Sequence, residues 1–197
     1  MNNPFRSLPE QISTLLNART PRKLDLKHSG RAAILMPIFK QDQEYFFLLT
    51  KRTQRVETHK GQISFPGGVK DVSDRDLLQT ALRESWEEIG LAPERVQILG
   101  EFDEYFSVTD LLVTPYAGWL DSQYDLRLNP DEVEEVFHVP FSVFRDSRLC
   151  RVETRRRLEV ERKIYFYNYE GKEVWGLTAQ IIRDFLKLID PPAPRSN

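Results

Sequence analysis

Several features that would assign a chain of 197 residues to a specialised class are scarce or missing from this sequence. It contains a single cysteine, Cys150, which excludes an intrachain disulfide framework and fits a reducing compartment. No apolar run approaches the roughly 20 residues that cross a membrane, and the first ten residues, MNNPFRSLPE, lack the apolar core of a secretory signal. We therefore expect a soluble cytoplasmic protein with no membrane partner.

The chain also lacks an excess of charge of either sign. Its 28 Lys and Arg residues nearly balance 30 Asp and Glu, which gives a formal net charge of −2 and a pI near 6.0. Nucleic-acid partners call for a basic groove, so the balance argues against them and against hydrolysis of RNA caps or 5′ ends. The hydrophobic content of 40% is enough for one domain with a full core.

The most informative stretch is residues 67–91, GGVKDVSDRDLLQTALRESWEEIGL. The pattern predicts a helix from near Asp76 to Ile89, which Gly90 ends as a C′ glycine. Within it Glu84, Glu87 and Glu88 stand at i, i+3 and i+4, so the three carboxylates share one face. The residues predicted on the opposite, buried face are Leu78, Leu82, Ser85, Trp86 and Ile89.

Acidic residues at helical spacing usually form a solvated surface, and that is the ordinary interpretation of these three. Crowded Glu side chains repel one another, however, by about a few tenths of a kcal/mol per pair. Arg83 precedes Glu84 and cannot neutralise all three carboxylates. Hard oxygen ligands with room for water and phosphate suit Mg²⁺ or Mn²⁺. We therefore expect this helix to hold a divalent metal ion.

These residues resemble the signature of the Nudix hydrolase family. The signature is a Gly, an acid six residues later, and then Arg-Glu-aliphatic-x-Glu-Glu-x-Gly-aliphatic; here it is Gly68, Asp74 and residues 83–91, RESWEEIGL. The chain departs from it in three ways: the acid is Asp, one extra residue separates it from Arg83, and Ser85 replaces an aliphatic residue. None removes an expected metal ligand. The resemblance implies an α/β fold with a mixed β-sheet sandwiched between helices (α/β/α).

Beyond this signature the chain resembles the coenzyme A diphosphatase branch of the family. The matching segments are LLTKRT at 48–53, HKG at 59–61, FPGG at 65–68, SVT at 107–109, VTP at 113–115, DEV at 131–133 and WGLTA at 175–179. The extra residue before Arg83 is also typical of that branch. One position differs, because Glu57 stands where the branch has an Arg. The resemblance implies hydrolysis of coenzyme A, free or acylated, to 3′,5′-ADP and 4′-phosphopantetheine.

The resemblance and the residue chemistry together predict the site. The expected metal ligands are Glu84, Glu87 and Glu88 with the Gly68 carbonyl, and Arg83 is expected to orient the carboxylates. The base is left open between Glu88 and Glu132, which lies on a polar loop. The residues expected to bind substrate are Arg52, Arg55, His59 and Lys60, since Arg pairs with phosphate through two hydrogen bonds and Lys acts as a point charge.

Three parts of the chain are expected: an N-terminal helix and connection over residues 1–30, a Nudix domain over 31–190, and a frayed tail over 191–197. The predicted elements are a helix over 4–17, a hairpin of strands at 32–39 and 45–50, strands at 96–106, 111–120 and 136–139, a helical turn from Pro140, a strand pair within 151–169, and a last helix capped by Thr178 and ending near Ile189. Trp175 is expected in the core.

Two alternatives to a coenzyme A diphosphatase stay open. Glu57 is compatible with an enzyme for another nucleoside diphosphate derivative, such as ADP-ribose or NADH. A nucleotide-binding domain without turnover is the alternative from another class, although no metal-site Glu is missing. In each case the expected partner is a small molecule, and the chain is expected to be a monomer or a homodimer.

Overall fold

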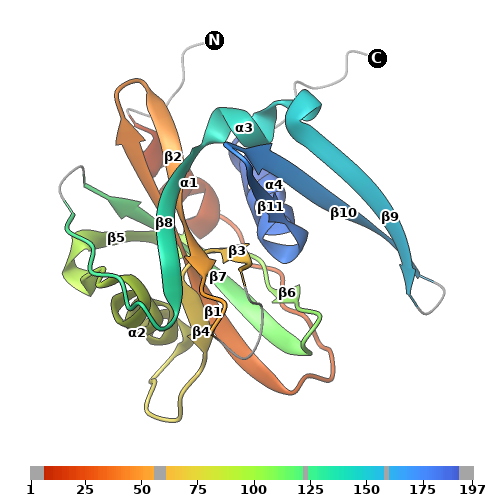
Figure 1. Ribbon diagram of the computed structural model, residues 1–197. Helices are drawn as coiled ribbons and strands as arrows, with labels where there is room; N and C mark the ends of the chain where they lie inside the picture. Colours follow the sequence, from red (N-terminus) through yellow and green to blue (C-terminus); the bar gives the residue numbers. More distant parts are fainter. Residues whose placement is uncertain (1–6, 56–60, 122–123, 158–159, 191–197) are drawn as a thin grey trace.

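The computed structural model describes residues 7–55, 61–121, 124–157 and 160–190 (Figure 1). Glu57, His59 and Lys60 lie outside the described residues, and so do the first residues of the expected helix over 4–17 and the tail over 191–197. The limits of the three expected parts of the chain therefore stay a prediction.

A mixed sheet of eight strands forms the centre of the described structure (Figure 1). Its middle strand, β1 (Gly30–Gln41), pairs antiparallel with β2 (Glu44–Arg52) and parallel with β7 (Leu111–Leu120). The main order is β3-β2-β1-β7-β5. The remaining strands are β3 (Ile63–Ser64), β4 (Gly67–Val69) on β1, β5 (Val96–Glu101), β6 (Tyr105–Phe106) on β7, and β8 (Val133–Pro140) on β2.

Helices cover both faces of this sheet, so the expected α/β/α architecture is confirmed. One face packs against α2 (Leu77–Ile89) and the other against α1 (Leu8–Asn17), α3 (Phe141–Arg145) and α4 (Gly176–Ile189). Successive side chains of a strand point to opposite faces. Accordingly Leu35 of β1 packs in the α2 layer, and Met36 packs with the helices of the opposite layer.

Two expected strands have different limits in the structure. The expected strand over 96–106 is divided into β5 and β6, with Gly100 at a φ of 153° near the break, and both parts pair with β7. The strand expected at 136–139 begins three residues earlier, because β8 already pairs with β2 at Val133. In both cases pairing with a neighbouring strand decides the limits.

A second, antiparallel sheet of three strands follows α3, after a short 3₁₀ turn, η2 (Ser147–Leu149). The expected pair is β9 (Cys150–Arg157) and β10 (Val160–Tyr169), and β11 (Lys172–Trp175) is an addition that the pattern did not reveal. Glu170 and Gly171 form its two-residue turn with φ values of 51° and 77°. In Figure 1 the β9–β10 hairpin extends away from the central sheet.

The expected cap of α4 is wrong. The helix begins at Gly176 directly after β11, with Trp175 at the N-cap position and no side-chain cap hydrogen bond. Thr178 lies in its first turn, and its hydroxyl donates to the Ile63 carbonyl at 3.3 Å. Thr178 therefore ties α4 to β3 instead of beginning the helix.

The limits of α2 agree with the prediction. Asp76 is the N-cap and accepts a hydrogen bond from the Gln79 N–H at 2.8 Å, and Gly90 ends the helix at a φ of 68°. Its buried face was predicted wrongly at one residue: Trp86 is 55% exposed, whereas Glu88 is 2% exposed. The buried stripe follows Ala81, Ser85 and Glu88 at i, i+4 and i+7, which turns Trp86 toward solvent.

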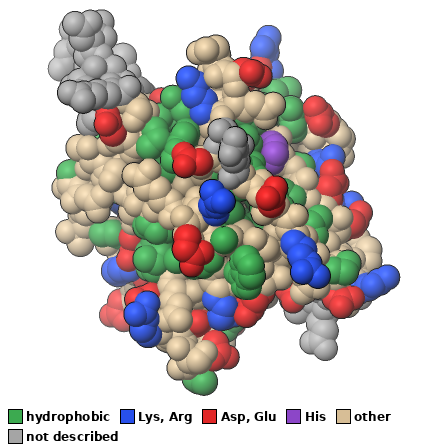
Figure 2. All heavy atoms as spheres, turned by 90° about the vertical axis from the view of Figure 1, so that its left-hand side faces the viewer, with side chains coloured by type: hydrophobic (Ala, Val, Ile, Leu, Met, Phe, Trp, Pro, Cys, Tyr) green, Lys and Arg blue, Asp and Glu red, His purple; other side chains and the backbone are tan. Residues whose placement is uncertain are grey.

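The molecular surface carries charges of both signs. Figure 2 shows acidic and basic side chains interspersed over the face that lies on the left in Figure 1, beside α2 and β5. Among the described residues, no helix is both long enough and apolar enough to span a membrane.

A buried ion pair fastens the turn before α2 to the helix. Arg83 donates to the Asp74 carboxylate from Nε and from Nη2, each at 2.9 Å, and the Thr80 hydroxyl and the Asp71 N–H also donate to it at 2.9 Å. Asp74 is 3% exposed. The Arg83 guanidinium holds the pKa of Asp74 well below its usual range. The extra residue before Arg83 therefore leaves this two-point pairing intact.

Substitution Asp74→Asn tests this pairing, because it removes the charge and keeps the volume. We expect the free energy of unfolding to fall by about 1–3 kcal/mol at pH 7, since Arg83 and its neighbours lose a buried acceptor. Because the pKa of Asp74 is lower in the folded state, its charge stabilises the fold fully above the unfolded-state pKa of about 3.8. This stabilisation is lost as the pH falls through the folded-state pKa. Urea unfolding at pH 7, 5 and 3 should therefore give a larger free energy of unfolding for the wild-type protein than for Asp74→Asn. This difference should become smaller only at pH 3.

The matched control is Asp125→Asn, at an exposed position. It should change the free energy of unfolding by less than about 0.5 kcal/mol. An Asp74→Asn effect that stays the same at all three pH values would contradict the stabilising role of the Asp74 charge.

Candidate active site

Four segments meet at the candidate site: the end of β2, β4, the part of α2 that carries Glu84, Glu87 and Glu88, and the loop over residues 124–132. Backbone hydrogen bonds join them. The Asn129 N–H donates to the Glu88 carbonyl at 2.9 Å, and the Thr53 N–H donates to the Glu132 carbonyl at 2.9 Å. The loop is thereby attached both to α2 and to β2, and residues far apart in sequence come together.

Arg83 connects the acidic residues of α2. Its Nη1 donates to Glu84 Oε1 at 2.9 Å and to Glu87 Oε2 at 2.8 Å, while the rest of the guanidinium holds Asp74. The Glu87 side chain is 50% exposed, so only one of the three carboxylates has the solvated setting of the ordinary interpretation. One arginine thus holds three carboxylates in place.

Glu88 is the buried carboxylate of the site. Its Oε1 accepts from Arg52 Nη1 at 3.1 Å and its Oε2 accepts from the Gly67 N–H at 3.1 Å. Burial raises the pKa of Glu88 to about 7, although the Gly67 N–H and Arg52 act in the opposite direction by stabilising the charged carboxylate. The charges of Glu84 and Glu132 add to the increase. Arg52, expected to bind substrate phosphate, is therefore paired with Glu88 in this structure.

Two glycines let β4 approach α2 and β1 closely. A Cβ on Gly68 would lie 2.5 Å from the carboxyl carbon of Glu84, and a Cβ on Gly67, whose φ is 148°, would lie 2.3 Å from the Ala33 carbonyl oxygen. No other residue type fits either position without a shift.

Burial raises the pKa of Glu84 above its usual value, with Glu87 and Glu132 adding to the effect.

Glu132 faces the same space from the loop. Its charge acts on both Glu84 and Glu88, and its Oε1 accepts a hydrogen bond from Asn129 Nδ2 at 3.2 Å. The sequence reasoning overlooked Asn129 and Thr53, which hold this loop. Thr53 lies in the matching segment LLTKRT at 48–53, and Asn129 lies in the sequence Asn-Pro-Asp at 129–131.

The expected substrate-binding residues are only partly placed. Arg55 lies on the exposed rim of the site, where its Nη1 is 3.5 Å from Asp131 Oδ1. His59 and Lys60 lie outside the described residues. Of the expected set, the described structure therefore brings Arg52 to the carboxylates and leaves Arg55 at the rim.

The donor set fits a hard divalent cation by its chemistry. Glu84, Glu87 and Glu88 supply carboxylate oxygens, and the charge of Glu132 acts on two of them; burial first, and these like charges second, raise the pKa of Glu84 and of Glu88. As the side chains stand, no three His, Cys, Asp or Glu residues of the described chain are arranged around a common metal position. Arg83 and Arg52 hold the carboxylates, so metal binding requires some of these hydrogen bonds to be exchanged for metal bonds.

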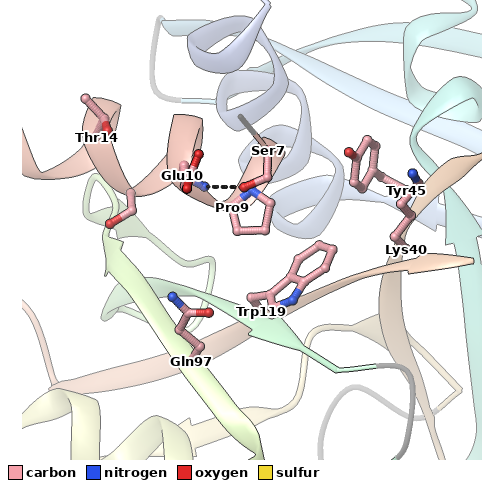
Figure 3. A pocket seen from close by; sticks show the side chains of 9 residues that line it. Ser7, Pro9, Glu10, Thr14, Lys40, Tyr45, Gln97 and Trp119 are labelled. Carbon is pink, nitrogen blue, oxygen red and sulfur yellow. Dashed lines mark hydrogen bonds between the residues drawn. The ribbon is translucent and has the colours of Figure 1, made fainter. Parts of the chain in front are cut away.

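A hollow of about 670 Å³ lies away from these residues, between α1 and the sheet (Figure 3). Lys40, Tyr45, Gln97 and Trp119 line its sheet side. Lys40 lies six residues along β1 from Ile34, which pairs with Gly67, and at strand spacing this is about 20 Å. The hollow is therefore separate from the carboxylate site.

Two comparisons with proteins of similar sequence agree with this geometry. The family model described as NUDIX domain matches residues 28–158. The chain is 36% identical over 170 residues to the uncharacterized Nudix hydrolase NudL of Photorhabdus laumondii, covering 86% of this chain and 89% of that one. It is 37% identical over 182 residues to NudL of Pectobacterium atrosepticum, with 91% and 94% covered.

Solved structures show the same fold. A MutT/nudix family protein from Enterococcus faecalis matches with a TM-score of 0.55 and 14% identity, over 94% of this chain and 76% of that one. An Ap4A hydrolase from C. elegans matches with a TM-score of 0.50 and 22% identity, over 57% and 81%. Since the family model covers more than half of the sequence, this chain belongs to the Nudix hydrolases, metal-dependent enzymes that cleave phosphorus anhydrides in nucleoside diphosphate derivatives.

Proposed function

We propose that this Nudix hydrolase cleaves the diphosphate of coenzyme A, free or acylated, to 3′,5′-ADP and 4′-phosphopantetheine or its acyl form. One observation carries the proposal. Arg52 and Gly67, both from the segments that resemble the coenzyme A diphosphatase branch, donate to the two oxygens of Glu88 from the Nudix signature. The features that resemble the branch thus belong to the same site as the general hydrolase signature.

Glu84, Glu87 and Glu88 are the proposed ligands of Mg²⁺ or Mn²⁺, together with the Gly68 carbonyl. When bound, such an ion screens the charge of the diphosphate and lowers the pKa of a coordinated water. Arg83 acts as a positioning residue, because its Nη1 holds Glu84 and Glu87 side by side. Its pairing with Asp74 fixes the guanidinium from the other side.

The proposed proton acceptor is Glu132. Both oxygens of Glu88 accept hydrogen bonds within the protein, and that side chain is buried. Glu132 uses only Oε1, so Oε2 has no hydrogen-bond partner among the described residues and is available to take a proton. Glu88 is then better suited to the ligand role than to the role of base.

Basic residues at the end of β2 are the proposed contacts for the diphosphate oxygens. The Arg55 side chain is largely exposed, and within the described part of the chain its guanidinium has only the long contact to Asp131, so little has to be broken before it binds phosphate. Arg52, which is paired with Glu88 in this structure, would be a second contact if a bound metal ion neutralised part of the Glu88 charge. We keep His59 and Lys60 in this set on the basis of their position in the sequence motif.

Glu57 supports a second candidate within the same reaction class. An acid in place of the branch's Arg reduces the attraction for a substrate with an additional phosphate group. ADP-ribose or NADH, which lack the 3′-phosphate of coenzyme A, are then the competing substrates. A binding domain without turnover is disfavoured because all three Glu residues of the signature are present.

Substrate and site can be tested together with a panel of coenzyme A, acetyl-coenzyme A, ADP-ribose, NADH and dNTPs, in the presence of Mg²⁺ or Mn²⁺. We expect chromatography to show 3′,5′-ADP released from coenzyme A. Glu88→Gln should lower kcat by about 100-fold or more, because a proposed metal ligand loses its charge. Glu94→Gln, at an exposed position in the 3₁₀ turn η1 (Pro93–Arg95), is the matched control and should retain activity.

If another diphosphate is cleaved preferentially, coenzyme A is not the main substrate, and the proposed carboxylate site is not contradicted. If wild-type protein cleaves no member of the panel, the enzymatic proposal is wrong and a binding domain becomes the better description.

Substitution Glu57→Arg restores the branch pattern and tests the basis of substrate choice. We expect kcat/KM for coenzyme A to rise by about tenfold relative to ADP-ribose, which corresponds to one additional charge-assisted contact of about 1.4 kcal/mol. Glu94→Arg makes the same charge change on η1 and should leave the ratio of the two substrates unchanged. An equal ratio in Glu57→Arg and wild-type protein would show that this position does not select the substrate.

A further inference from the structure

The loop over residues 124–132 ends α2 as well as carrying Glu132. The last carbonyls of a helix have no partners within it. Here the Arg127 N–H donates to the Ile89 carbonyl at 2.8 Å, and the Asn129 N–H donates to the Glu88 carbonyl at 2.9 Å. A Cβ on Gly90 would lie 2.9 Å from the Arg127 backbone nitrogen, so glycine permits this close contact. The loop is therefore fixed to the turn of α2 that carries Glu87 and Glu88.

Asn129 is the centre of this attachment. Its carbonyl accepts from the Glu132 N–H at 3.1 Å and from the Val133 N–H at 2.9 Å, and its side-chain Oδ1 accepts from the Asp131 N–H at 3.2 Å. Because Oδ1 is occupied by a backbone donor, the orientation of the amide is determined. Its Nδ2 must then point the other way, and it donates to Glu132 Oε1 at 3.2 Å.

The hydrogen bond from Asn129 opposes the repulsion that acts on the Glu132 carboxylate. Glu84 and Glu88 face it with like charge, and a flexible Glu side chain at a half-buried position can relieve the repulsion by turning to solvent. Thr53 contacts only the backbone of the loop: its N–H donates to the Glu132 carbonyl, and its hydroxyl donates to the Asp131 carbonyl at 2.8 Å. Among the described residues, Asn129 alone donates a hydrogen bond to the Glu132 carboxylate.

We propose that Asn129 is a positioning residue, whose side-chain amide holds the Glu132 carboxylate toward Glu84 and Glu88 and leaves Glu132 Oε2 available for the reaction. This inference rests on the proposed role of Glu132. The backbone hydrogen bonds of Asn129 shape the loop whatever its side chain is. Among the residues that the structure describes, the Nδ2 donor serves only Glu132, and the proposed role belongs to this donor.

Substitution Asn129→Asp separates the two roles. It keeps the size of the side chain and the Oδ1 acceptor for the Asp131 N–H, and it replaces the donor to Glu132 with a repelling oxygen. We expect kcat to fall by about 10–100-fold, as when an outer-shell partner is lost, while KM and the melting temperature change little. In a Glu132→Gln background the same substitution should cause no further loss of kcat, because residues that act as a unit are not additive.

A crystal structure of Asn129→Asp supplies a readout that does not depend on turnover. We expect an unchanged loop backbone and a Glu132 carboxylate turned away from Glu84 and Glu88. Glu132 in its original position, or an equal loss of kcat in both backgrounds, would overturn the proposal. Full activity in Glu132→Gln would overturn it too, and would leave the proposed metal ligands of α2 and the substrate assignment intact. If wild-type protein cleaved no substrate, the proposed function would fail, and the position of Glu132 would still decide the role of Asn129.

Discussion

Negative charge crowded onto one helix is the constraint on which the arrangement of this site depends. Glu84, Glu87 and Glu88 lie within two turns of α2, and Asp74 packs beside them. Two arginines from different segments offset part of this charge: Arg83 pairs with Asp74, Glu84 and Glu87, and Arg52 pairs with Glu88. Charges of this kind are costly to bury unless they are paired, so the position of each element around them is restricted.

Close backbone contacts make these pairings possible. Gly67 and Gly68 bring β4 against both β1 and the Glu84 carboxylate, and Gly90 brings the loop over residues 124–132 against the end of α2. The same loop satisfies carbonyls of the helix and presents Glu132 to the carboxylates. Stability and proposed catalysis therefore share their contacts here. Loosening the loop would both expose the helix end and misplace an acid of the site.

The arrangement also suits the acidic residues to different proposed roles. Glu88 is buried with both oxygens occupied, Glu87 is half exposed, and Glu132 has one tethered and one available oxygen. Chemically identical side chains are thus suited to different tasks by burial and by the number of hydrogen bonds each accepts. The donors that create this difference, Arg52, the Gly67 N–H and Asn129, come from three segments outside α2.

The sequence by itself determined the features that depend on local spacing. The limits of α2, the common face of its Glu residues, the β1–β2 hairpin and the sandwich of helices and sheet follow from periodicity, turn residues and the family signature. Only the tertiary structure decided that Trp86 faces solvent while Glu88 is buried, that Thr178 binds the Ile63 carbonyl, and that Arg52 pairs with Glu88. Local periodicity defines a face but not what packs against it. These outcomes depend instead on contacts between segments tens of residues apart in the chain.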